Sequence, residues 1–214
     1  MITTYVHCAE AGFPYVVKTP QRMQDGLPLV IQLHGAGERG NGDAEALPLV
    51  EKHGFSAILT EEQEYECVVV MPQCQQDSFW VAQIPVIKEF VLKMISEYQC
   101  DPCKVCLTGL SMGGYGTWFT AMAYPDLFAA IAPCCGGGMP WNASVLKMPV
   151  WAFHGAEDDV AYPYESENMI DKMRQNGLNP QLTVYENCGH NSWDYAYNEE
   201  LLYWLIQQEQ SRWR

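Results

Sequence analysis

Short apolar runs alternate with amphipathic stretches along most of this chain. The runs are nearly continuous, as in strands covered on both faces of a sheet, whereas the stretches between them have helical spacing of apolar positions. This pattern predicts strands at residues 29–33, 67–71, 105–108, 129–132, 150–153 and 182–185, and helices at residues 43–53, 83–98, 113–124, 164–176 and 199–208. The repeated alternation of strand and helix predicts an α/β sandwich with a mostly parallel central sheet and helices on both faces.

Two further features refine this outline. Residues 3–8 and 15–18 are predicted to form an antiparallel hairpin at the sheet edge, and Gly177 is placed to cap the preceding helix. No internal repeat, low-complexity segment or long linker divides the chain. Its 214 residues, 48% of them hydrophobic, therefore predict one domain, residues 1–214, with a substantial core.

The chain is strongly acidic. Its 26 Asp and Glu residues against 12 Lys and Arg residues give a formal net charge of −14. A field of this sign repels phosphate backbones and anionic membrane surfaces. We therefore expect no nucleic-acid or membrane partner, and a neutral or cationic small molecule is easier to admit than a polyanion.

The N-terminal sequence MITTYVHCAEAGF lacks the basic and apolar regions of a signal peptide, and no apolar run approaches the roughly 20 residues that span a bilayer. A cytoplasmic location is the expectation. The nine cysteines cannot all pair, and reduced thiols are the simpler interpretation. Cys100 and Cys103 have CxxC spacing, but no second CxxC or histidine pair follows. Buried core cysteines are therefore favoured over a metal site.

The first candidate for chemistry is GLSMG, residues 109–113, which follows one predicted strand and precedes a predicted helix. Ligand sites of parallel sheets lie beyond the carboxyl ends of strands, as this segment does. It matches G-x-S-x-G, in which the glycines leave room for a strained turn that exposes the serine, here Ser111. The Met112 amide would donate to a developing oxyanion. The alternative is a glycine-rich turn with an incidental serine.

The second candidate is the glycine-rich loop LHGAG, residues 33–37, which follows the strand of residues 29–33. Such a loop lets the backbone approach a substrate oxygen, and the Ala36 amide is the predicted second oxyanion donor. We interpret His34 as ordering the loop rather than as a catalytic base. Arg39 could hold a polar substrate group, but bracing of the loop through Glu38 or Asp43 is favoured.

A general base and an acid should follow later strands. Residues 150–153 lead into three adjacent carboxylates, Glu157, Asp158 and Asp159, and the residues themselves do not choose among them. Of the five histidines, only His190, after the last predicted strand, sits where a general base is needed. The others are interpreted as structural or solvated: His7, His34, His53 and His154.

Taken together, the chain resembles compact bacterial carboxylesterases of the phospholipase/carboxylesterase and dienelactone-hydrolase-like group, close to the catalytic domains of prolyl-oligopeptidase-like hydrolases. The resemblance is carried by LHGAGERGNGD, DPCKVCLTGLSMGGYGTW, YPDLFAAIAPCCGGG, FHGAEDDVAYPYESENM and TVYENCGHNSWDYAY, spanning residues 33–197. It implies the α/β-hydrolase fold and a catalytic triad of Ser111, Asp158 and His190, because family members read H-G-x-x-D at the acid. The segment VAYP departs from the usual Val-Pro spacing, and counting back from Pro163 would favour Asp159.

The connection GGGMPWNASVLKMP, residues 136–149, is too short for the cap domain that lipases of this fold carry there. An open cleft that accepts short or accessible esters is therefore expected. Aromatic residues near the predicted loops could stack on a sugar or phenolic group, or simply pack the loops onto the sheet: Phe79, Trp80, Tyr115, Tyr162, Tyr164 and Trp193.

The favoured function is a serine carboxylesterase that hydrolyses a small-molecule ester through an acyl-enzyme on Ser111. No cofactor or metal is implied, because the triad and two backbone amides suffice for acyl transfer. A serine peptidase of the prolyl-oligopeptidase-like type is one alternative, although neither a propeller nor an N-terminus-binding glutamate motif is evident. A non-catalytic binding protein that keeps the α/β-hydrolase fold is the other.

Overall fold

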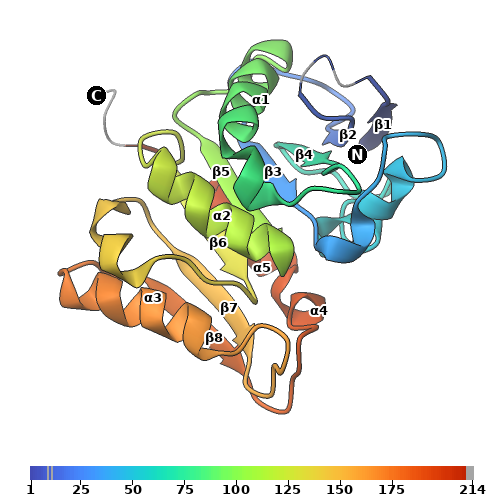
Figure 1. Ribbon diagram of the computed structural model, residues 1–214. Helices are drawn as coiled ribbons and strands as arrows, with labels where there is room; N and C mark the ends of the chain where they lie inside the picture. Colours follow the sequence, from blue (N-terminus) through green and yellow to red (C-terminus); the bar gives the residue numbers. More distant parts are fainter. Residues whose placement is uncertain (9, 11, 211–214) are drawn as a thin grey trace.

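The computed structural model describes residues 1–8, 10 and 12–210, so the last four residues of the predicted domain lie outside it. Within this part, eight strands form one sheet in the order β1-β2-β4-β3-β5-β6-β7-β8 (Figure 1). In this spatial order, the six strands from β4 to β8, β3 included, are parallel to their neighbours. At the other edge, β2 pairs antiparallel with both β1 and β4. The strands are β1 Ile2–Val6, β2 Tyr15–Thr19, β3 Leu29–Leu33, β4 Val68–Pro72, β5 Val105–Leu110, β6 Ala130–Cys134, β7 Trp151–Gly155 and β8 Gln181–Tyr185.

The central strands are buried on both faces, as their continuous apolar runs predict. In β3, Leu29, Ile31 and Leu33 belong to the core on one face of the sheet, and Val30 belongs to the core on the other. The six strands predicted after the N-terminal hairpin and the hairpin itself are confirmed, with ends shifted by one or two residues in several of them.

Helices cover both faces of the sheet (Figure 1). Helices α1, α2 and α3 pack on one face, and α5 packs on the other. In α1 the buried positions Ile87, Phe90, Val91 and Met94 have helical spacing. The helices are α1 Ile84–Glu97, α2 Met112–Ala123, α3 Tyr164–Gln175, α4 Trp193–Ala196 and α5 Glu199–Ile206. Four of the five predicted helices are confirmed, and Gly177 follows α3 with a φ of +77°, as a C-terminal cap does.

The helix predicted for residues 43–53 is wrong. The segment starts with a turn in which the Asp43 carboxylate accepts hydrogen bonds from the amides of Glu45 and Ala46, which is the pattern of a helix N-cap, but no α-helix follows it. Pro48 then brings no amide donor, and only a short 3-10 helix forms. The 3-10 segments, which lack a long periodic pattern, are η2 Ala36–Glu38, η3 Leu47–Glu51, η4 Gly54–Ala57, η5 Trp80–Gln83 and η6 Pro140–Val145.

The only regular element between β6 and β7 is the short 3-10 helix η6. This connection is too small to form a cap domain, as the sequence predicts. No helix in the described ranges is long and apolar enough to cross a membrane. All nine cysteines carry free thiols, and most are buried.

We expect the substitution Gly113→Ala to destabilise the fold strongly. A Cβ on Gly113 would lie 2.1 Å from the carbonyl oxygen of Leu33, which belongs to the backbone of a central strand and cannot move aside. The free energy of unfolding, measured by urea denaturation, should fall by about 3 kcal/mol.

Gly37→Ala is the matched control, because a Cβ there meets no atom within 4 Å. Its unfolding free energy should stay within about 0.5 kcal/mol of the parent value. Equal urea midpoints for the two variants would show that the approach of α2 to β3 is not a steric constraint.

Candidate active site

Ser111 stands on a tight turn between β5 and α2. Its backbone has φ 53° and ψ −115°, a left-handed conformation that costs a residue with a side chain roughly 1–3 kcal/mol. Flanking glycines make the turn possible, since a Cβ on Gly109 would lie 2.3 Å from the carbonyl oxygen of Gly113. The Ser111 amide is held by the carbonyl oxygen of Cys134 at 3.0 Å.

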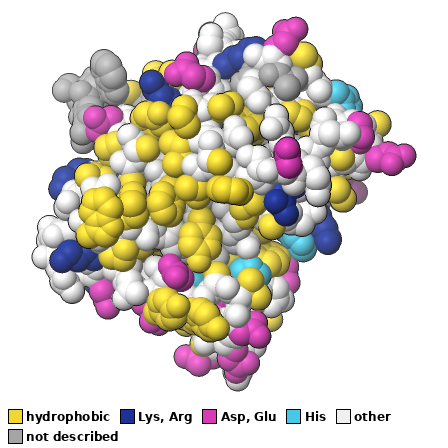
Figure 2. All heavy atoms as spheres, viewed as in Figure 1, with side chains coloured by type: hydrophobic (Ala, Val, Ile, Leu, Met, Phe, Trp, Pro, Cys, Tyr) yellow, Lys and Arg dark blue, Asp and Glu magenta, His cyan; other side chains and the backbone are white. Residues whose placement is uncertain are grey.

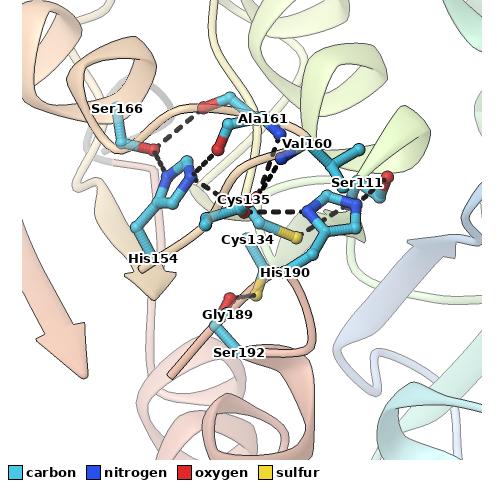
Figure 3. Close-up of polar contacts among 12 residues, drawn as sticks. Ser111, Cys134, Cys135, His154, Val160, Ala161, Ser166, Gly189, His190 and Ser192 are labelled. Atoms are coloured by element: carbon cyan, nitrogen blue, oxygen red, sulfur yellow. Dashed lines mark hydrogen bonds and ion pairs between the residues drawn. The ribbon is translucent and has the colours of Figure 1, made fainter. Parts of the chain in front are cut away.

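A chain of hydrogen bonds links Ser111 to a buried carboxylate (Figure 3). The Ser111 Oγ lies 2.8 Å from His190 Nε2, and His190 Nδ1 lies 2.8 Å from Asp158 Oδ2. Because a carboxylate only accepts, His190 donates through Nδ1, which leaves Nε2 as the acceptor for the serine hydroxyl. The three residues brought together are those that the family resemblance selects.

The loop that follows β7 buries Asp158 but leaves its two acidic neighbours exposed. Asp158 is 3% exposed, and its Oδ1 accepts hydrogen bonds from the amides of Val160 and Ala161. Glu157 and Asp159 point to solvent instead. The structure therefore brings Asp158, and not Asp159, to the imidazole of His190. The fold distinguishes the three carboxylates by burial, which their adjacency in sequence could not do.

His154 orders the loop that holds this carboxylate. The ring is fully buried, with Nε2 2.7 Å from the carbonyl oxygen of Ala161 and Nδ1 2.8 Å from Ser166 Oγ (Figure 3). Its Nε2 also lies 3.3 Å from Asp158 Oδ2. The ordering role expected for His154 is confirmed.

The two predicted oxyanion donors belong to the first residues of two helical segments near the nucleophile. Met112 is the first residue of α2 and Ala36 is the first residue of η2, so the amide of each lacks an acceptor within its own helix. Ala36 and Ser111 line the same cleft. The arrangement offers two backbone donors near the serine, which is the requirement for binding a developing oxyanion.

The loop that carries Ala36 is ordered from beneath by His34. The His34 Nε2 accepts a hydrogen bond from the Cys74 amide, and its Nδ1 lies 2.6 Å from the carbonyl oxygen of Gly35. Burial lowers the pKa of His34 to about 4, so the ring is neutral at pH 7. Arg39 also braces the loop, but through the carbonyl oxygens of Ala36 and Ser78 rather than through the expected carboxylates.

The Ser111 side of the turn lines a cleft of about 250 Å³. Exposed carboxylates flank the loops that follow β7 and β8, and Figure 2 shows acidic side chains gathered at that end of the molecule. The cleft is lined by Gly35, Ala36, Gly37, Glu38, His53, Leu110, Ser111, Val160, His190 and Trp193.

The sequence interpretation missed two members of this lining. Glu38 was assigned to bracing the loop, although its position just after the predicted oxyanion donor is a signal that could have drawn attention to it. His53 gave no signal, because its segment was predicted to be a helix end. Trp193, one of the aromatic candidates, lies with its ring 5.2 Å from that of His190.

One set of ligand atoms at the site could hold a metal ion. Single atoms of Cys135, Asp158 and His190 lie within 4.8 Å of one another. Burial raises the pKa of the Cys135 thiol well above its usual range. The thiol is therefore protonated at neutral pH, and its Sγ accepts a hydrogen bond from the Ser111 amide at 3.2 Å. A metal ion there would have to displace the Asp158–His190 hydrogen bond.

The eight-stranded sheet with its serine turn and helices on both faces is the α/β-hydrolase fold. The sequence model of the dienelactone hydrolase family matches residues 59–199, about two thirds of the chain. The chain belongs to this family.

Three known proteins illustrate the relationship. A bifunctional acetylxylan esterase/xylanase of Neocallimastix patriciarum is 28% identical over 86% of this chain and 29% of its own length. A poly(3-hydroxyalkanoate) depolymerase C of Paucimonas lemoignei is 32% identical over 55% of this chain and 30% of its own length. The crystal structure of a thermostable esterase superposes with a TM-score of 0.80 and 30% identity, over 98% of this chain and 63% of that one.

The chain thus spans less than a third of the length of the two sequence relatives. Both the family and these esterase relatives support the predicted class, a carboxylic ester hydrolase.

We expect Ser111→Gly to be more stable than Ser111→Ala. Both substitutions remove Oγ, but only alanine keeps the Cβ that makes a φ of 53° unfavourable. After allowing for the greater freedom of glycine in the unfolded chain, the difference in unfolding free energy should be about 1 kcal/mol, measured by urea denaturation.

The same pair of substitutions at Ser192, where φ is −57°, provides the control and should give the opposite order. An alanine variant at residue 111 that matches or exceeds the glycine variant would show that the serine turn is not strained.

Proposed function

We propose that this protein is a serine carboxylesterase that hydrolyses short or accessible carboxylic esters through an acyl-enzyme on Ser111. The observation that carries the proposal is the hydrogen-bonded chain from Ser111 through His190 to Asp158, of which Ser111 and His190 line an open cleft. The names of the esterase relatives support the ester as substrate, and the sharing of a fold with peptidases does not favour an amide.

In this mechanism His190 takes the proton of Ser111 as Oγ attacks the ester carbonyl carbon. The amides of Ala36 and Met112 donate to the oxyanion that forms. When the bond to the alcohol oxygen breaks, His190 returns the proton to that oxygen and the acyl group stays on Ser111. Water then attacks the acyl-enzyme with His190 again as base, which releases the acid and restores the serine. Asp158 holds the imidazole in the tautomer that accepts at Nε2.

The dimensions of the site and the charge of the protein support a small ester that carries no negative charge. A cleft of about 250 Å³ is smaller than the roughly 300–1,000 Å³ of pockets that bury drug-sized ligands. The net charge of −14 opposes the approach of anionic substrates.

The direct test is hydrolysis of para-nitrophenyl esters from acetate to octanoate by the wild type and by Ser111→Ala. We expect kcat/KM to fall as the acyl chain outgrows the cleft. The alanine variant should lose activity by about 10⁴-fold or more, because without Oγ no acyl-enzyme can form. No ester hydrolysis by the wild type would favour a peptidase, if an aminoacyl amide is cleaved, or otherwise a binding protein.

A second test concerns the acid. Asp158→Asn should lower kcat by about 10³–10⁴-fold, because an amide at this position no longer selects the tautomer of His190 that accepts from serine. The exposed neighbour provides a matched control, and Asp159→Asn should retain activity within about twofold. Loss of turnover in Asp159→Asn with retention in Asp158→Asn would reverse the assignment.

A further inference from the structure

The cleft contains a carboxylate that the reaction does not use. Glu38 is 5% exposed, and among the described residues its side chain has only one close partner, His53, with 3.9 Å between Glu38 Oε1 and His53 Nε2. No described residue donates a hydrogen bond to its oxygens, and Glu38 lines the open cleft, so this group can accept hydrogen bonds from a ligand. Covering such a carboxylate without giving it a hydrogen-bond donor is unfavourable. A Cβ on Gly35 would lie 3.1 Å from Glu38 Oε2 and 3.7 Å from the Cβ of Ser111, which places the carboxylate beside the nucleophile.

His53 is held at the cleft by the interior of the protein. The buried Gln32 side chain in β3 donates to the carbonyl oxygen of His53 and accepts from the amide of Phe55. Gly54 allows this close approach, since it has a φ of +85° and a Cβ there would lie 2.3 Å from the Gln32 amide nitrogen. The backbone of His53 is therefore fixed by the fold, and its ring reaches the cleft from there.

Trp193 connects this pair to the general base. Its ring centroid lies 5.3 Å from that of His53 and 5.2 Å from that of His190. Because His190 returns the proton to the departing alcohol, the alcohol part of the ester must lie on the His190 side of the nucleophile. The wall that faces the alcohol then consists of an aromatic ring, an imidazole and a carboxylate.

We propose that Glu38 and His53 form a binding site for hydroxyl groups of the leaving alcohol, and that the preferred substrates are short-chain esters of sugars. This proposal rests on the proposed esterase function. A carboxylate accepts hydroxyl protons and an imidazole N–H donates to a hydroxyl oxygen, so the pair matches neighbouring hydroxyls on one ring.

Two other kinds of alcohol fit this wall less well. A plain aliphatic alcohol would cover the Glu38 carboxylate without giving it a donor, which is the unfavourable case. A quaternary-ammonium alcohol would balance the charge of Glu38, but it donates no hydrogen bond to the carboxylate and offers no acceptor to an N–H of His53.

The experiment compares kcat/KM for three acetate esters with one acyl group: a monoacetylated methyl xyloside, cyclohexyl acetate and acetylcholine. For the wild type we expect the sugar ester to exceed cyclohexyl acetate. Glu38→Gln should lower the ratio of sugar ester to cyclohexyl ester by roughly tenfold to a hundredfold, mainly through KM. Glu89→Gln, on the exposed face of α1, is the matched control and should leave the ratio unchanged.

A second variant tests the same site in case Glu38→Gln does not fold. His53→Phe keeps a ring against Trp193 but removes both nitrogens, and it should lower the same ratio. An unchanged ratio in both variants, or a selective loss of acetylcholine hydrolysis, would overturn the hydroxyl site while leaving the esterase proposal standing. Failure of the wild type to cleave any ester, with no difference from Ser111→Ala, would overturn both.

Discussion

The site depends on how closely the start of α2 approaches the backbones of β3 and β6. A Cβ on Gly113 would meet the carbonyl oxygen of Leu33 at 2.1 Å, and one on Gly114 would meet that of Cys134 at 2.3 Å. Only glycine fits at such separations. This contact sets Ser111 at the helix start and draws the loop that follows β3 next to it. The positions of the nucleophile and of the two amide donors are thus consequences of one backbone packing constraint.

A second constraint is electrostatic. The site gathers at the carboxyl ends of β3, β5, β7 and β8, as expected for a parallel sheet. There Asp158 is buried and fully surrounded, with two amides on Oδ1 and two imidazoles near Oδ2. Glu38 is buried to a similar extent, but among the described residues its side chain has only the His53 imidazole as a partner, at 3.9 Å. Asp158 therefore has a full set of partners, whereas Glu38 faces the open cleft.

Elements and site residues that depend on a short stretch of sequence could be predicted from the sequence alone. The strands, the serine turn and His190 could be predicted because apolar runs, glycine spacing and position after a strand are properties of short segments. Asp158 required the family pattern, since adjacent carboxylates differ only in how the folded loop buries them. The helix expected at residues 43–53 and the roles of Glu38 and His53 could not be predicted. Short 3-10 segments lack periodicity, and the cleft wall arises from packing between loops far apart in sequence.

Of the groups around the nucleophile, the general base His190 is attached to the least stable part of the sheet. Ser111 follows β5 in the middle of the sheet, whereas His190 follows β8, an edge strand with a neighbour on one side only. Edge strands open locally at lower free energy than central ones. Fraying of β8 would withdraw the imidazole while the serine turn and the core stayed native. Heat inactivation can therefore run ahead of global melting, and the surviving activity reports on the edge of the sheet more than on its centre.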